Sequence, residues 1–382
     1  MNKINTPIQI LQSIIPSKTL EERLAQDYNF EEKARKFSAI DLLHFYLEAG
    51  VKRWTGYREG SETLVEQGDF ESLNHSTISK KAQEVPYEFF RDLFQELLQR
   101  LTTSQKKKFL KDYSLFAIDS TTITFRHQTR SWAKYRKHLY AIKLHTEFNI
   151  DQKMPTHVFD TTGKDSDIMM APLIFLHKDF PAIRVADRAY GAKDLLDQLS
   201  SEEKPFVIRL KAGIKHDVQS HNEFDFNEEW PVVADYNAFL GAKNTQTTYT
   251  YRIVTVPSET GEPIYLATNV MDLKAEKISE VYKMRWEIEL FFRWIKQNLD
   301  IPNPFGMSKN KVLSQVYATL IAYLLLRSTF NETQPKWSTY TKLSFKEFTR
   351  KFIKSTLPIE VGIEIGLLLK NWRSVSNSTG KI

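Results

Sequence analysis

Cysteine is absent from the 382-residue chain, which excludes disulfides and thiolate zinc sites. The nine histidines are scattered and do not form a metal-ligand pattern. The longest apolar run, Val316 to Leu326, is too short to span a bilayer and predicts a buried helix, so no membrane partner is expected. The first residues, Met-Asn-Lys-Ile-Asn-Thr-Pro, do not form a signal peptide, and we expect a cytoplasmic protein.

The composition is that of a globular protein with a modest excess of positive charge. Hydrophobic residues make up 41% of the chain, enough for packed cores, and the length predicts two or three domains. The net charge of +6 favours polyanionic partners without proving them. No repeat or low-complexity segment is present. Function must therefore be sought in local motifs.

The segment from Tyr282 to Lys296 gathers Tyr, Arg, Glu and Lys on one side of a predicted continuous helix. At 3.6 residues per turn, Tyr282, Arg285, Glu289 and Lys296 fall within an arc of roughly 60°, and Arg293 joins them. The opposite side is a core-facing stripe of Met284, Ile288, Phe291 and Ile295. A carboxylate among cationic and phenolic groups suits a site for a metal and a phosphodiester. Arg285 and Glu289 also form an i,i+4 pair typical of solvated helices, so the segment alone leaves both interpretations open.

Two further carboxylates occur beside predicted strands. Asp119 lies inside the β-prone run 113–125, where an acid is costly unless it is hydrogen-bonded or bound to a cation. Asp187 ends a short strand, before a helix predicted over 192–199. Carboxylates at strand ends of α/β sheets face the crevice where ligands bind. A turn or capping role explains Asp187 as well, but capping does not explain Asp119.

A basic segment follows the strand that carries Asp119. Between residues 126 and 138 there are five formal positive charges and no acid, interleaved with Trp and Tyr. This pattern is typical of a loop that follows phosphates and stacks on bases, although a solvated surface loop remains the alternative. The residues expected to contact DNA are Arg126, Arg130, Trp132, Lys134, Arg136 and Lys137.

The first 110 residues are predicted to be helical. Helical spacing occurs over 20–25, 39–49 and 87–101, and Gly50 suits the end of the second of these helices. A short helix near 75–83 begins with Ser/Thr residues and carries Lys80 and Lys81. Such a cluster resembles a helix-turn-helix unit in which these lysines contact DNA, and an ordinary helical bundle fits almost equally well.

The next 100 residues predict an α/β fold. Strands are expected near 113–125, 139–150, 154–161, 181–187 and 205–211, with helices at 169–176 and 192–199. A hairpin is expected at 249–256 and 263–269, inside a β-rich segment from 212 to 274. Residues after 300 again have helical spacing, and the segment 343–372 is amphipathic.

Taken together, the chain resembles the insertion sequence 4 family of DDE transposases. The helix segment matches its Y-x2-R-x3-E-x6-K signature, and Asp119-Ser-Thr-Thr-Ile, Asp187-Arg-Ala-Tyr-Gly and Tyr265-Leu-Ala-Thr-Asn269 resemble neighbouring motifs. The resemblance covers about residues 30 to 330. It implies a ribonuclease H-like catalytic core interrupted by a β-rich insertion, with helical regions at both ends. The expected divisions are 1–110, a DNA-binding domain; 111–211, the first part of the core; 212–274, the insertion; 275–335, the second part; and 336–382, the helical C-terminal region.

The resemblance also implies roles for individual residues. Asp119, Asp187 and Glu289 become the catalytic triad that binds two Mg²⁺ ions, with Mn²⁺ as a substitute and no small-molecule cofactor. Tyr282, Arg285 and Lys296 become contacts to the DNA backbone near the scissile phosphate, and Arg293 and Arg188 are expected to contact DNA beside them. Family members can also use an aromatic of the insertion to stabilise a flipped base, for which the candidates are Trp230, Tyr251 and Tyr265; a packing role is the alternative for each.

The implied activity is cut-and-paste transposition. Water first frees a 3′-OH at the element end, which then attacks the opposite strand to close a hairpin and finally joins target DNA. The expected partners are double-stranded DNA, as terminal inverted repeats and target, and a second copy of the chain on paired ends, in the nucleoid of a prokaryote. Two alternatives remain open, a domesticated nuclease that cuts without joining and a DNA-binding regulator without catalysis.

Overall fold

The structure is a computed structural model that describes residues 6–34, 36–101, 109–125, 131–136, 139–176, 182–225, 229, 231–258, 261–298 and 304–379. The chain divides into two compact units. Unit 1 comprises Met1–Ser104, Ile123–Tyr140 and Arg293–Ile382, and unit 2 comprises Gln105–Thr122 and Ala141–Phe292. The two units are groups of residues that pack together, and they do not test the five domains expected from the sequence, which stay a prediction.

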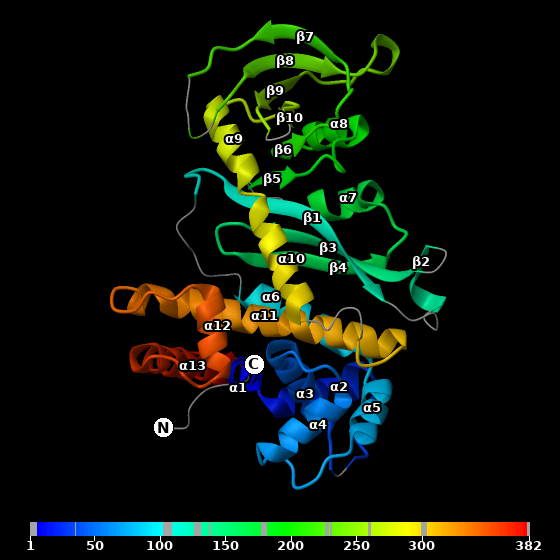
Figure 1. Cartoon of the computed structure of the whole chain (residues 1–382), viewed down its shortest axis with the longest axis vertical. Coiled ribbons are helices and arrows are strands. Elements are labelled where there is room, and N and C mark those ends of the chain that lie inside the picture. The colour runs from blue at the N-terminus through cyan, green and yellow to red at the C-terminus, as the bar shows by residue number, and fades with distance from the viewer. Residues whose placement is uncertain are drawn as a thin grey trace. The chain divides into compact units, whose positions relative to one another are not determined.

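Unit 1 is helical. Its helices are α1 Pro7–Ile14, α2 Ser17–Asp27, α3 Ala39–Lys52, α4 Tyr57–Glu66, α5 His75–Glu84, α6 Tyr87–Leu101, α11 Lys309–Trp337, α12 Phe345–Ile353 and α13 Ile359–Thr379, together with the short 3₁₀ helix η1 Ser131–Ala133. The long helix α11 packs against α6, α3 and α13 (Figure 1). Among the described helices, α11 alone has the length and apolarity to cross a membrane, but 94% of its most apolar window is buried, so these residues form the core.

Two details of unit 1 correct the sequence predictions. Helix α3 does not end at Gly50 but continues to Lys52, and Arg53 with φ 62° ends it. Gly50 is instead a packing position, because a Cβ there would lie 3.0 Å from Thr319 Oγ1 of α11. Helix α5 is capped by Asn74, whose side chain accepts from Ser76 N–H, rather than by a Ser or Thr.

Unit 2 contains most of the sheet, while β2 and the last residues of β1 fall in unit 1. The strands of the described chain are β1 Ser114–Phe125, β2 Lys134–Arg136, β3 Leu139–Asn149, β4 Met154–Thr162, β5 Ala182–Ala186, β6 Phe206–Arg209, β7 His216–His221, β8 Ala234–Leu240, β9 Tyr251–Val256 and β10 Ile264–Thr268. They pair in the order β2-β3-β1-β5-β6-β10-β9-β8-β7, and β4 pairs with β3. Strands β1, β5 and β6 run parallel, and the strands of the expected β-rich segment continue the same sheet in antiparallel fashion.

The expected core strands are all present because their apolar runs are buried. All five residues of β5 are buried, as are the first three of β6. Helices α7 Asp167–Phe175 and α8 Lys193–Ser201 belong to the same hydrophobic core as the middle of β1 and the end of β5, and this core includes Ile118, Ala186 and Tyr190. This packing holds in place the point at which β1 and β5 stop pairing.

The predicted continuous helix through residues 282–296 is wrong. The chain forms α9 Ala275–Lys283 and then α10 Trp286–Asn298, with a turn at Met284 and Arg285 between them (Figure 1). The turn is tightened by i→i−3 bonds, from Arg285 N–H to Tyr282 O at 3.1 Å and from Ile288 N–H to Arg285 O at 3.2 Å. The apolar stripe of α10 is nevertheless observed, since Ile288, Phe291 and Ile295 are buried.

Candidate active site

Asp119, inside β1, and Asp187, directly after β5, lie side by side where these two strands stop pairing. Strands β1 and β5 are parallel, with Ile118 paired to Ala186, and each acid directly follows its paired residue. Asp119 is 22% exposed and accepts a hydrogen bond from the Ser120 backbone N–H at 2.7 Å. The two carboxylates are therefore brought together by strand register.

The turn after Asp187 explains part of its neighbouring motif. Asp187 Oδ1 accepts from Ala189 N–H at 2.8 Å, so this carboxylate does carry a turn role. It is not a helix cap, because the residue before α8 is Ala192. Gly191 passes close to β6, and a Cβ there would lie 2.7 Å from Arg209 O. Only glycine fits this approach without a shift of the backbone.

Glu289 is connected to Asp119 through Arg285. The Arg285 guanidinium donates to Glu289 Oε1 at 2.6 Å and to Asp119 Oδ2 at 3.4 Å. Its side chain is 15% exposed, and the side chains of Asp119 and Glu289 are 22% and 30% exposed. Arg285 thus joins two of the three acids from the turn that divides α9 from α10.

The charges of this cluster act on one another. Burial, with smaller contributions from the negative charges of Asp187 and Glu289, raises the pKa of Asp119 to about 7, against the opposing effects of the Ser120 N–H and of Arg285. A cation would relieve this repulsion, and three carboxylates are the hard oxygen donors that Mg²⁺ prefers. In the described part of the chain no three acid or histidine side chains are already close enough to hold a metal, consistent with Arg285 lying between two of them.

Tyr282 lies on the last turn of α9 and is largely buried beside two arginines. Its ring centroid is 6.0 Å from the Arg285 guanidinium carbon. Burial raises the pKa of Tyr282, while Arg285 and a side-chain hydrogen bond with Arg209 act in the opposite direction. Arg209, at the end of β6, was missed in the sequence because a single arginine after an apolar strand carries no motif. Arg293 and Lys296 follow on α10 and are exposed.

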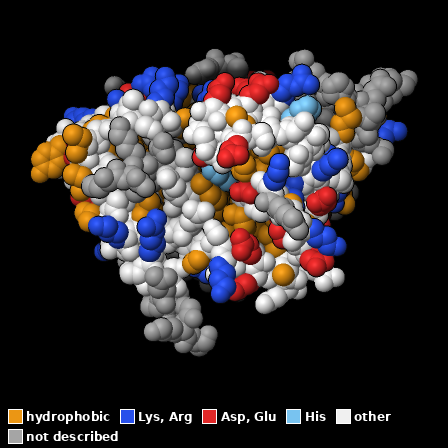
Figure 2. Space-filling model, turned by 90° about the horizontal axis from the view of Figure 1, so that it is seen from below, with side chains coloured by type: hydrophobic (Ala, Val, Ile, Leu, Met, Phe, Trp, Pro, Cys, Tyr) orange, Lys and Arg blue, Asp and Glu red, His pale blue; other side chains and the backbone are white. Residues whose placement is uncertain are grey.

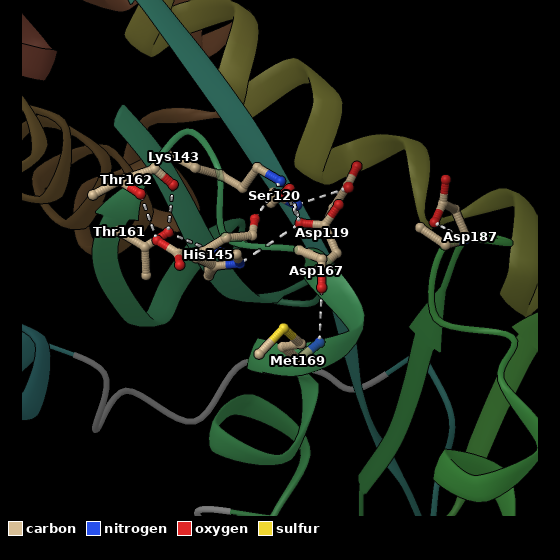
Figure 3. A network of polar contacts seen from close by, with 12 residues as sticks. Asp119, Ser120, Lys143, His145, Thr161, Thr162, Asp167, Met169 and Asp187 are labelled. Atoms are coloured by element: carbon tan, nitrogen blue, oxygen red, sulfur yellow. Dashed lines mark hydrogen bonds and ion pairs between the residues drawn. The ribbon is translucent and has the colours of Figure 1, made fainter. Parts of the chain in front are cut away.

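A polar network beside Asp119 was also missed in the sequence (Figure 3). It connects Ser120 and Asp167 to Lys143 and His145 of β3. Tyr190 is buried and interacts electrostatically with these groups. Burial and the charges of Asp167, Asp119 and Asp187 raise its pKa well above the ordinary value, with the Ser120 hydroxyl acting in the opposite direction. Single polar residues alternating along β3 give no sequence signal beyond that of a strand face.

A hollow of about 580 Å³ opens beside Asp187. Asp167 and Asp187 both line it, together with the exposed cations Arg188 and Lys211. The predicted DNA contact Arg188 therefore lines the same hollow as Asp187.

The basic segment is only partly described. Arg126, Arg130 and Lys137 lie outside the described residues, as does the side chain of Arg136. Lys134 is exposed. Trp132 is half-buried and donates from its indole N–H to Met307 O at 3.1 Å, so its polar edge is used within unit 1.

The paired lysines of α5 differ from each other. Lys80 is exposed. Lys81 is only 5% exposed and its Nζ lies 2.6 Å from Glu32 Oε1, so its side chain is engaged in an ion pair within unit 1. The DNA contact expected of each lysine stays a prediction, and the burial of Lys81 argues against its own. The face in Figure 2 shows Lys and Arg side chains in separate groups, with acidic and apolar side chains between them.

Of the three aromatic residues considered for a flipped base, the structure describes Tyr251 and Tyr265. Tyr251 is fully buried and its hydroxyl donates to Asp197 Oδ1 at 2.7 Å, which favours a packing role. Tyr265 is half-buried, with its ring edge-on to His216 at 4.9 Å. Trp230 lies outside the described residues.

Comparisons with known proteins agree with one another. The family described as "Transposase DDE domain" matches residues 110–325. A probable transposase for insertion sequence element IS5377 of Geobacillus stearothermophilus is 31% identical, over 94% of this chain and 94% of that protein. A protein described as a transposase for insertion sequence element IS4SA, from Synechocystis sp., is 23% identical over 67% of this chain and 72% of that protein.

A solved structure is also similar in fold. The piggyBac transposase, determined in a synaptic complex with hairpin DNA, superposes with a TM-score of 0.52 at 9% identity. The match covers 98% of this chain and 85% of that one.

Proposed function

Because this chain belongs to the insertion sequence 4-like family of DDE transposases, we propose that it performs cut-and-paste transposition with Asp119, Asp187 and Glu289 as its catalytic acids. The observation that carries this proposal is the register of β1 and β5, which brings two acids together, with Glu289 joined to them through Arg285.

The catalytic core is proposed to be ribonuclease H-like. The three long strands β1, β3 and β4 are followed by alternating helices and strands, and the neighbour order β4-β3-β1-β5-β6 also supports this assignment. The likeness to the piggyBac transposase supports the same fold. The β-rich strands that follow extend one edge of this core before α9 and α10 bring Glu289.

The three carboxylates would hold the divalent ions. When bound, two Mg²⁺ ions would supply activation of the attacking oxygen and stabilisation of the leaving oxygen of a phosphodiester. The donor set fits, because Asp119 carries a raised pKa through burial and like charges and all three donors are carboxylates. Mn²⁺ is expected to substitute for Mg²⁺, and no other cofactor is required.

Arg285, Tyr282, Arg209 and Lys296 are proposed to hold DNA phosphates. Arg285 pairs with Asp119 and Glu289 in the protein alone, and once ions balance those charges its planar guanidinium is available to a phosphate. Tyr282 is a hydrogen-bond donor to a phosphate oxygen and not a nucleophile. Arg188, Arg293, Lys80 and the basic segment extend the contact along double-stranded DNA.

The course of the reaction and the assembly are proposed from the same family. The freed 3′-OH attacks the opposite strand, which closes a hairpin and releases the flanking DNA. A second water then opens the hairpin and regenerates the 3′-OH that attacks target DNA, and two copies of the chain act on paired inverted-repeat ends. The protein is proposed to work in the cytoplasm, on the nucleoid of a prokaryote, without a membrane.

A plasmid cleavage assay tests this function. The substrate carries the DNA that flanks the gene, and wild type is compared with Asp119→Asn in Mg²⁺. Precise excision at both flanks, with hairpin or free 3′-OH ends that vanish in the mutant, is the expected result. Cleavage without joining would favour a nuclease, and tight, site-specific binding without cleavage would favour a regulator. Nicking that survives the mutation would refute the assignment of Asp119.

A further inference from the structure

Ser120 is bound to two carboxylates at once (Figure 3). Its backbone N–H donates to Asp119 Oδ1 at 2.7 Å, and its hydroxyl donates to Asp167 Oδ1. Asp119 belongs to β1 and Asp167 to the first turn of α7. The residue next to the catalytic acid is therefore tied to a second element of the fold.

Asp167 is itself held from β3. Lys143 Nζ lies 3.3 Å from Asp167 Oδ1 and donates to the backbone oxygen of Asp165 at 2.9 Å. The Lys143 side chain is 12% exposed, so this contact is shielded from water. The ammonium group attracts the Asp167 carboxylate, and the hydrogen bond that the Ser120 hydroxyl donates to this carboxylate is charge-assisted.

His145 also packs beside Asp167 and Lys143. Its Nδ1 lies 3.7 Å from Asp167 Oδ1, its Nε2 lies 2.9 Å from Thr161 Oγ1, and its ring stacks on Phe159 at 5.0 Å. Burial lowers the pKa of His145 to about 4, so the imidazole is neutral near neutral pH. The positive charge beside Asp167 therefore comes from Lys143, and the neutral His145 ring packs against Asp167.

We propose that Asp167 is a positioning residue for Asp119 and acts through Ser120. The inference rests on the proposed function, in which Asp119 binds a metal ion. Asp167 and Lys143 fix the Ser120 hydroxyl, and this fixes the N–H that orients the Asp119 carboxylate. Partners that orient metal-binding carboxylates typically change metal affinity or activity by roughly 10–100-fold when they are removed.

The test measures Mn²⁺ binding to the full chain by electron paramagnetic resonance, independently of cleavage. Asp167→Ala and Ser120→Ala are each expected to weaken Mn²⁺ binding by roughly 10–100-fold. Asp167→Asn keeps an oxygen that accepts from Ser120, so it should retain more affinity than Asp167→Ala. The matched control is Asp165→Ala, because that carboxylate accepts from Thr162 and not from Ser120.

A kinetic readout separates positioning from catalysis. Raising the Mn²⁺ concentration should restore cleavage by Asp167→Ala, because the defect is in metal affinity, and should not restore Asp119→Asn. Unchanged Mn²⁺ affinity in folded Asp167→Ala, or an equal loss in Asp165→Ala, would overturn the proposal. If Asp167→Ala does not fold, Ser120→Ala, which removes one oxygen atom, decides the same question. Wild-type Mn²⁺ affinity in Asp119→Asn would instead overturn the proposed function.

Discussion

Asp119 and Asp187 directly follow Ile118 and Ala186, which are paired in register on the parallel strands β1 and β5. Both strands are buried up to this pair, so neither acid can move away without disturbing the core. Like charges held together at a poorly solvated position repel one another until a cation or a proton arrives. This enforced proximity leads to measurable pH and mutational effects.

Stability without divalent ions should depend on the ionisation of Asp119. Its pKa rises from 3.8 to about 7 on folding, so between these values the folded state holds a proton that the unfolded chain has lost. Stability therefore falls as pH rises through this window, and the loss is complete above it. Asp119→Asn should have a higher free energy of unfolding than wild type, by up to a few kcal/mol, at pH values above the window. Below the window the two proteins should have the same free energy of unfolding.

Urea denaturation at pH values on both sides of the window measures this difference, and Asp194→Asn, at an exposed position, is the control. An equal difference at both ends would contradict it.

The Arg285 charge should set the pH at which cleavage begins. Arg285 lowers the pKa of Asp119, so Arg285→Ala should raise that pKa and move the pH–rate midpoint for Mg²⁺-dependent cleavage upward. Cleavage rates measured across the neutral range test this. The control is Arg188→Ala, an exposed arginine that should weaken DNA binding without moving the midpoint. A midpoint that stays in place or falls would show that Arg285 does not act on Asp119.

Loss of the Glu289 charge should separate cleavage from binding. Glu289→Gln removes a proposed metal ligand and no proposed phosphate contact, so cleavage should be abolished while binding to the element end stays within a few-fold. Electrophoretic mobility shifts and cleavage assays measure the two quantities. Glu287→Gln, which alters an ion pair with Lys153 at 2.9 Å, is the matched control and should still cleave.

Replacing the basic side chains of the 126–138 segment should act on DNA binding, whereas Glu289→Gln should act on cleavage. Binding should weaken and its salt dependence should become shallower, because fewer counterions are released. A titration of DNA binding against salt concentration measures this slope. Equal loss of binding in Glu289→Gln and in the basic-segment variant would contradict both assignments.

Gly191 should be intolerant of a side chain. A Cβ there meets Arg209 O at 2.7 Å, so Gly191→Ala must shift the turn after Asp187 or strand β6. Overpacking of this kind costs about 1–3 kcal/mol, and thermal or urea denaturation measures it. The control is Gly362→Ala in α13, where a Cβ meets nothing within 4 Å and helix propensity should instead raise stability. Equal stability of the two variants would show that the contact with Arg209 is relaxed at no cost.

Several elements were predictable because their signals are local. The strand expected at 113–125 is observed as Ser114–Phe125, and the helix expected at 87–101 is observed at the same residues. Apolar periodicity predicts both, since burial follows the period of the backbone. The break at Met284 and Arg285 carried no such signal, because neither glycine nor proline marks it. Likewise, adjacent lysines look alike in a sequence, and only the position of Glu32 shows that Lys81 is buried.

The amino-acid sequence by itself determined the strand and helix content, the order of the three acids and the motif that indicates the family, because these depend on local periodicity and spacing. Only the tertiary structure decided which side chains meet. Arg285 reaches Asp119 across 166 positions, and Ser120 reaches Asp167 across 47. Such contacts depend on strand register and on helices packed against the sheet, which are cooperative properties of the whole core.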